Sequence, residues 1–179
     1  NPQNLDTDIG PIISKTSLDS LNAYVKSFED NNYSIFRSAD DIDENFVAPT
    51  IIEIDNISDL KDEQFGPILH IVRFKSNEID ALIENINDSG FGLTMGIHTR
   101  VEKRADIFSD KCNVGNIYIN RDMVGAVVGS QPFGGQNLSG SGYKAGGPNY
   151  LLQFLNEKVV SKNSVAFGGN TELLNIQED

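Results

Sequence analysis

Few side chains in this sequence have the chemistry of a nucleophile or a metal ligand. Cys112 is the only cysteine, and His70 and His98 are the only histidines. Both histidines fall in segments expected to be strands, and neither has a cysteine or histidine partner at a metal-ligand spacing. We therefore interpret them as ordinary strand residues and predict no metal site.

Cys112 is the one candidate for covalent catalysis. Lys111 beside it could favour a thiolate, but the cysteine also continues the apolar face of a helix expected over residues 101–112. A free cysteine on such a face behaves as a small hydrophobic residue. The pattern favours a packing role, so no catalytic residue is assigned in this chain.

A glycine-rich stretch is the second chemical feature. Residues 125–147 contain eight glycines, and Lys144 is the only charged residue between positions 125 and 155. Glycine at this density suggests backbone held in unusual conformations or pressed close to a ligand. Residues 140–145 match the relaxed dinucleotide fingerprint, but the expected strand before it and helix after it are missing, which disfavours that interpretation.

Four short motifs carry more information when they are considered together. They are Glu-Gln-Phe-Gly-Pro at 63–67, Gly-Asn-Ile-Tyr-Ile-Asn at 115–120, Gln-Pro-Phe-Gly-Gly at 131–135 and Ser-Gly-Ser-Gly at 139–142. Their order and spacing resemble the C-terminal half of the aldehyde dehydrogenase superfamily, and the resemblance covers nearly the whole chain.

One subfamily is the most similar. Residues 123–129, just before the Gln-Pro-Phe-Gly-Gly motif, resemble the substrate-anchoring loop of glutamate-semialdehyde (pyrroline-5-carboxylate) dehydrogenases. Residues 144–148 and 166–170 resemble the corresponding module of the bifunctional proline utilization A family.

The resemblance implies a role for five residues. Glu63 would bind the nicotinamide ribose hydroxyls of NAD, a task that suits a carboxylate because it accepts hydrogen bonds. Phe65 would lie against the nicotinamide. The amides of Gly125 and Ala126 would hold the α-carboxylate of the substrate, since small residues let backbone N–H groups converge on an anion. Phe133 would pack on the aliphatic chain of the aldehyde.

The catalytic residues of the family have no counterpart in this chain. The nucleophilic cysteine, the general-base glutamate, the oxyanion asparagine and the dinucleotide-binding domain would all lie upstream of Asn1. We therefore expect the chain alone to be inactive and to supply part of an active-site wall that upstream segments of a longer parent complete.

The periodicity predicts the elements that must position these residues. A helix is expected over 16–29, with Thr16 and Asp19 as its capping pair, and two more over 78–88 and 101–112. Strands are expected over 33–37, 50–54, 68–74, 93–98, 114–119 and 157–162. From residue 68 onward strands and helices alternate, which implies crossover units and a parallel sheet whose ligands lie beyond the strand C-termini.

The predicted fold class is therefore α/β, a partial aldehyde dehydrogenase catalytic domain with a parallel-strand sheet flanked by helices. It would span residues 1–162, with residues 163–179 as a C-terminal tail. The net charge of -12 argues against a nucleic-acid partner. No apolar run reaches the roughly 20 residues of a membrane span. The single cysteine fits a reducing compartment, and we expect the cytoplasm.

We predict that the parent oxidises L-glutamate 5-semialdehyde to glutamate with NAD. The resemblance further implies FAD in an upstream proline dehydrogenase domain and a homo-oligomeric assembly. Two alternatives stay open, namely an aldehyde dehydrogenase of other substrate and a non-catalytic assembly or binding domain. An upstream cysteine in a glycine- and serine-rich context would favour the enzyme over the binding domain.

Overall fold

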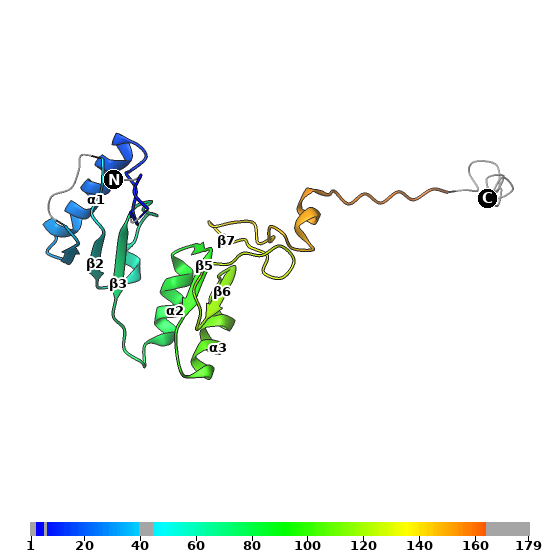
Figure 1. The fold of residues 1–179 in the computed structure, drawn as a ribbon. Helices are drawn as coiled ribbons and strands as arrows, with labels where there is room; N and C mark the ends of the chain where they lie inside the picture. The colour runs from blue at the N-terminus through cyan, green and yellow to red at the C-terminus, as the bar shows by residue number, and fades with distance from the viewer. Residues whose placement is uncertain (1–2, 6, 40–44, 164–179) are drawn as a thin grey trace.

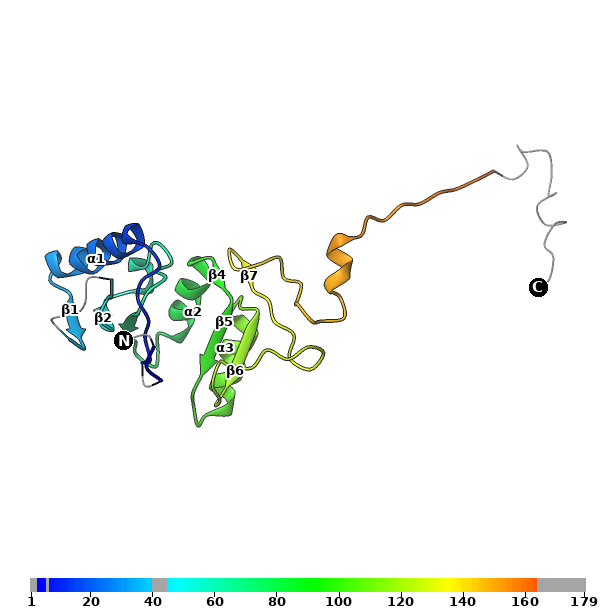
Figure 2. The ribbon, with the colours of Figure 1, turned by 45° about the horizontal axis from the view of Figure 1, so that its top comes forward.

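The computed structural model describes residues 3–5, 7–39 and 45–163. Figure 1 shows two α/β units side by side, which we call the first unit (α1 and β1–β3) and the second unit (α2, α3 and β4–β7). An irregular segment with one short helix follows them, and Figure 2 shows the same separation from another side.

Helix α1 (Lys15–Asp30) forms because its apolar residues recur on one face. Leu18, Leu21, Val25 and Phe28 are its buried residues, as the periodicity predicted. The expected capping pair of Thr16 and Asp19 was wrong. The helix starts one residue earlier, so the Ser14 side chain is the cap and accepts a hydrogen bond from the Ser17 amide at 3.1 Å.

The first unit is completed by a three-stranded sheet in the order β1-β2-β3. Strand β1 (Ser34–Arg37) pairs antiparallel with β2 (Thr50–Ile54), which pairs parallel with β3 (Ile68–Val72). One face of the sheet packs on α1, where Val25 and Phe28 meet Ile52 and Ile54. This cluster is the core of the first unit.

The second unit is built on a parallel pair. Strands β5 (Thr94–Ile97) and β6 (Asn116–Ile119) pair in register, and α3 (Glu102–Lys111) connects them, which confirms the predicted crossover. The expectation of one parallel sheet from residue 68 onward was wrong. Strand β3 pairs with β2 rather than β5, because alternation of elements predicts crossovers but does not determine which strands become neighbours.

Side chains lock the two helices of the second unit together. On α2 (Ile79–Asp88), the Asn87 amide donates to the Lys111 carbonyl at 2.9 Å and its oxygen accepts from the Asn113 amide at 2.8 Å. Lys111 also bonds to Asp80 at 2.6 Å. These contacts fix the end of α3, from which the chain enters β6.

Four short elements were not predicted. A 3-10 turn, η1 (Ile57–Asp59), precedes β3, and another, η2 (Tyr150–Phe154), follows the glycine-rich stretch. Strand β4 (Phe91–Gly92) pairs antiparallel with β7 (Gln136–Asn137). Pairs this short carry no periodic signal, so sequence patterns cannot find them.

The strand expected over residues 157–162 was also wrong. The chain there is extended and exposed, and no described segment pairs with it. Figure 1 shows this run leading away from the second unit. A strand needs a neighbour for its amides and carbonyls, which its own composition does not supply.

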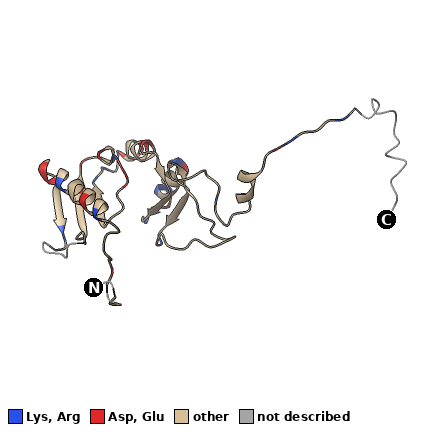
Figure 3. Cartoon of the chain, turned by 90° about the horizontal axis from the view of Figure 1, so that it is seen from above, with Lys and Arg blue, Asp and Glu red and all other residues tan. Residues whose placement is uncertain are grey.

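Charge is unevenly distributed along the chain. Figure 3 shows acidic and basic residues on the three α-helices, whereas residues 123–156 contain Lys144 as their only charged residue. Among the residues the structure describes, none of the helices has the length and apolar character needed to cross a bilayer.

Candidate functional site

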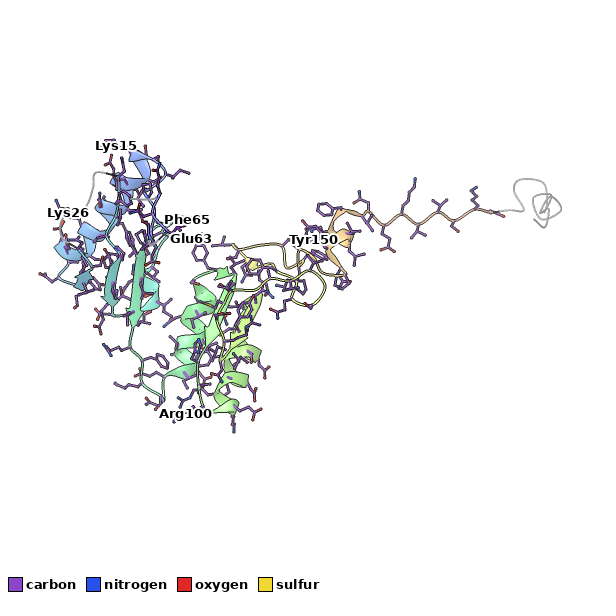
Figure 4. The ribbon with its side chains drawn as sticks, viewed as in Figure 1. Lys15, Lys26, Glu63, Phe65, Arg100 and Tyr150 are labelled. Atoms are coloured by element: carbon purple, nitrogen blue, oxygen red, sulfur yellow. The ribbon has the colours of Figure 1, made fainter. Side chains whose placement is uncertain are left out.

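A cleft of about 670 Å³ lies between the two units. One wall comes from η1, the loop 62–65 and β3, and the other from the end of α2, strands β4 and β5 and residues 138–139. Figure 4 shows Glu63 and Phe65 on the edge of the first unit that faces the second. Both residues line the cleft.

The loop before β3 presents these two side chains to solvent. The Gly66 amide donates to the Gln64 carbonyl at 3.0 Å and the Ile68 amide donates to Gly66 at 2.8 Å, which makes a tight turn. A Cβ at Gly66 would lie 2.7 Å from Leu21 of α1, so glycine lets the loop approach the helix. Phe65 is held outward and is 83% exposed, rather than packed in a strand.

Glu63 has the properties of an available hydrogen-bond acceptor. Its side chain is exposed, and among the described residues its carboxylate has no hydrogen-bond or ion-pair partner. An exposed carboxylate beside an exposed aromatic ring can accept bonds from the hydroxyls of a ligand whose planar ring covers the aromatic.

Gly125 and Ala126 lie in the loop that leaves the C-terminal end of β6. Gly125 has φ of 129°, a conformation that L side chains rarely adopt. Ala126 is exposed. The loop closes as a hairpin in which Val127 and Gln131 bond to each other through both amides, at 2.8 and 2.7 Å. Ligands of parallel strands bind at this end.

Phe133 follows the hairpin and is half-buried. Its backbone pairs with Ala145 through hydrogen bonds of 3.1 and 2.8 Å. Asn116 holds the peptide groups on both sides, because its amide nitrogen donates to Pro132 at 3.2 Å and its oxygen accepts from Gly134 at 3.1 Å. Phe133 therefore sits on backbone that is fixed from both directions.

Sequence reasoning did not identify the polar residues that hold this stretch. Besides Asn116, the Ser139 hydroxyl accepts from the Gly92 amide at 3.0 Å, and the Lys144 ammonium donates to the Gly134 carbonyl. Burial lowers the pKa of Lys144. A lone lysine in an uncharged stretch was the one available signal. The buried Gly135 has room for no side chain, since a Cβ would lie 2.4 Å from the Ser139 carbonyl.

The structure brings the predicted site residues together only in part. Glu63 and Phe65 share the cleft, whereas Gly125, Ala126 and Phe133 lie on one segment outside its lining. The two groups are linked through residues 136–139, which pair with β4 and reach the cleft wall.

The remaining chemical candidates behave as packing or surface residues. Cys112 is buried at the end of α3, and burial raises the pKa of its thiol, which opposes nucleophilic attack. His70 lies in β3, as predicted, but His98 falls just after β5 and is exposed. Residues 140–145 follow a turn and open no helix, so the strand–turn–helix setting that a dinucleotide motif requires is not found at these residues. No metal-ligand cluster occurs in the described part of the chain.

Residues 1–160 match the aldehyde dehydrogenase family. The chain belongs to this family. Within it, the bifunctional protein PutA of Klebsiella aerogenes is 43% identical over 175 residues, which are 93% of this chain and 13% of that protein.

Two solved structures are similar to this chain. A crystal structure of a Bradyrhizobium japonicum proline utilization A (PutA) mutant matches 90% of this chain with a TM-score of 0.78 and 41% identity. The 1-pyrroline-5-carboxylate dehydrogenase from Thermus with bound NAD matches 83% with a TM-score of 0.72 and 33% identity. This chain spans 17% and 29% of those two chains. The α/β fold of a partial aldehyde dehydrogenase domain is thereby confirmed.

Proposed function

We propose that this chain is the C-terminal part of the catalytic domain of a cytoplasmic, NAD-dependent dehydrogenase that oxidises L-glutamate 5-semialdehyde to glutamate. The observation that carries the proposal is the 43% identity with PutA along 93% of the chain. The arrangement of the five candidate residues supports it, and we propose for each the task that the family resemblance implies.

The cofactor side of the site is Glu63 and Phe65. The unpartnered carboxylate accepts hydrogen bonds from the ribose hydroxyls of NAD, and the exposed ring packs on the nicotinamide. Their positions on one cleft wall fit such a group. When bound, NAD supplies the hydride acceptor for aldehyde oxidation.

The substrate side is the hairpin and the residue that follows it. The Gly125 and Ala126 amides donate to the α-carboxylate of the substrate without a basic side chain in direct contact. The half-buried Phe133 covers the aliphatic part of the substrate, which excludes water from it. Together they select an aldehyde that carries an amino-acid head group.

The nucleophile comes from outside this chain. Cys112 is its only cysteine and is buried, so thiolate attack on the aldehyde requires a residue of the longer parent. The upstream NAD-binding and catalytic-cysteine segments are thus partners of this chain, within a homo-oligomer. A second, FAD-dependent proline dehydrogenase domain in the parent stays a prediction, as do the boundaries at residues 1–162 and 163–179.

The test measures NAD reduction by the full-length protein with glutamate semialdehyde and with propanal, which has no carboxylate. Ala126→Leu should raise the KM for glutamate semialdehyde about tenfold or more, because the bulkier side chain keeps the anion away from the amides, and change propanal oxidation far less. Val128→Leu is the matched control, since Val128 is 85% exposed in the same hairpin.

The outcomes separate the proposal from its alternatives. If both substrates lose efficiency equally, the hairpin has no role in selecting the head group. Preference for propanal in the unsubstituted enzyme would favour an aldehyde dehydrogenase of other substrate. A full-length protein that reduces no NAD with either aldehyde would favour a non-catalytic assembly or binding domain.

A further inference from the structure

Arg121 contacts both arms of the hairpin that carries Gly125 and Ala126. It lies one residue beyond Asn120, after the end of β6. Its guanidinium donates to the Val124 carbonyl at 3.0 Å on the first arm and to the Gln131 side chain at 3.3 Å on the second. Its Nε donates to the Asp122 carbonyl at 3.3 Å.

Arg121, which we call the brace of the hairpin, also contacts the second unit. The guanidinium carbon lies 5.3 Å from the centre of the Tyr118 ring, and Tyr118 is buried within β6. A cation over an aromatic face in this range is attracted to the ring. The planar group therefore spans from the rigid parallel pair to the hairpin.

The Gln131 side chain connects Arg121 to Gly125. With its amide turned by half a rotation, the nitrogen donates to the Gly125 carbonyl at 2.7 Å while the oxygen accepts from Arg121 at 3.2 Å. A Cβ at Gly125 would lie 3.0 Å from the arginine, so the glycine leaves room for the guanidinium. Arginine and glutamine thus orient the peptide group whose neighbouring amides face the substrate.

We propose that Arg121 is the positioning residue that determines the affinity of this hairpin for a carboxylate, by holding its two arms in the geometry in which the Gly125 and Ala126 amides converge. This inference rests on the proposed function of those amides. The charge attracts Arg121 to the Tyr118 ring and to the Asp122 carboxylate 3.6 Å away, but bracing also needs its fork of donors, because three separate carbonyl or amide oxygens are contacted at once.

The test compares Arg121→Gln, Arg121→Lys and the control Arg100→Gln in the full-length protein. Arg100 is an exposed arginine that follows the C-terminal end of β5, as Arg121 follows that of β6. Figure 4 shows it at the bottom of the second unit. Both Arg121 substitutions should raise the KM for glutamate semialdehyde about tenfold, with kcat and the propanal kinetics changed less than about threefold. Arg100→Gln should change neither KM.

A double-substitution cycle tests the connection through Gln131. Gln131→Met should also raise the KM for glutamate semialdehyde. In the double variant with Arg121→Gln, the fold increase in this KM should be smaller than the product of the two single increases, because both residues hold the same hairpin geometry. Full activity in Arg121→Lys would overturn the bracing role. So would multiplicative effects in the cycle, or equal losses for propanal. If Ala126→Leu also fails to distinguish the substrates, the proposed function itself is wrong, whereas a selective Ala126→Leu with a non-selective Arg121→Gln rejects only this inference.

Discussion

At the scale of single residues, the candidate site combines groups that are recognisable from sequence with groups that are not. Glu63, Phe65 and Phe133 stand in short motifs with a distinctive order, so their neighbourhood could be predicted. Asn116 and Ser139 bond to backbone 16 and 47 residues away, and nothing local in the sequence indicates such targets. Arg121 was overlooked although it and Asp122 are the only charged residues between Lys111 and Lys144.

The Glu63 assignment leads to a prediction about the cofactor. In the full-length protein, Glu63→Gln should weaken transition-state stabilisation by about 1–3 kcal/mol, because a charged acceptor for hydroxyl groups is lost. Steady-state kinetics with varied NAD measures the effect. Asp62→Asn is the matched control, since Asp62 lines the same cleft on the same loop. Unchanged kinetics in Glu63→Gln would show that the residue is a surface acid.

At the scale of elements, helix faces were predictable and strand partners were not. The stripe of α1 is contained within its own 16 residues, so periodicity was sufficient. Pairing of β3 with β2 instead of β5, and the absence of a partner for residues 157–162 in the described chain, depend on segments distant in sequence. The β5-α3-β6 unit was found because its parallel connection is local.

The contact between α1 and β3 predicts a pH dependence. Tyr24 on the helix hydrogen-bonds to His70 at 3.0 Å, and burial lowers the pKa of His70 below its ordinary value of 6.5. As the pH falls below that value, the unfolded histidine binds a proton while the folded one stays neutral, so acid favours unfolding. His70→Gln should reduce the loss of stability between about pH 7 and pH 5.

Urea unfolding of the full-length protein, followed by circular dichroism at both pH values, measures this difference. His98→Gln is the control, because His98 is exposed after β5. An acid-induced loss of the same size in His70→Gln would contradict the prediction.

The glycine-rich stretch should be sensitive to a single methyl group. Gly135→Ala forces a Cβ to within 2.4 Å of the Ser139 carbonyl, and relieving such overpacking costs about 1–3 kcal/mol. Hydrogen exchange of the amides in residues 134–142 of the full-length protein should become faster. Gly10→Ala serves as the comparison, since nothing lies within 4 Å of a Cβ there. Equal exchange in both variants would show that the stretch can repack.

At the scale of the whole molecule, the first unit presents an uncovered apolar face. Phe36, Ile51 and Leu69 are neighbours across the sheet on the side opposite α1, and Phe36 and Leu69 are 64% and 57% exposed. Apolar surface of this kind recruits partners. When produced alone, the chain should self-associate as its concentration rises, as light scattering would detect.

Leu69→Lys should reduce this association, because it places a charge on the exposed β3 side of the face. Asn22→Lys adds the same charge to the exposed side of α1 and should have little effect. A monomeric mass at all concentrations would show that this apolar face does not cause self-association.

The extended run after η2 should be the part of the described chain that a protease cleaves first. Residues 156–162 make no hydrogen bond among the described residues, so a protease can bind this backbone without first unfolding anything. Trypsin should cut after Lys158 and Lys162 long before it cuts after Lys26 in α1 or Lys103 in α3. Mass spectrometry of a digestion time course would show the order, and simultaneous cleavage at all four lysines would mean that the helices open as readily as the tail. The first stable product should therefore retain both α/β units and the hairpin.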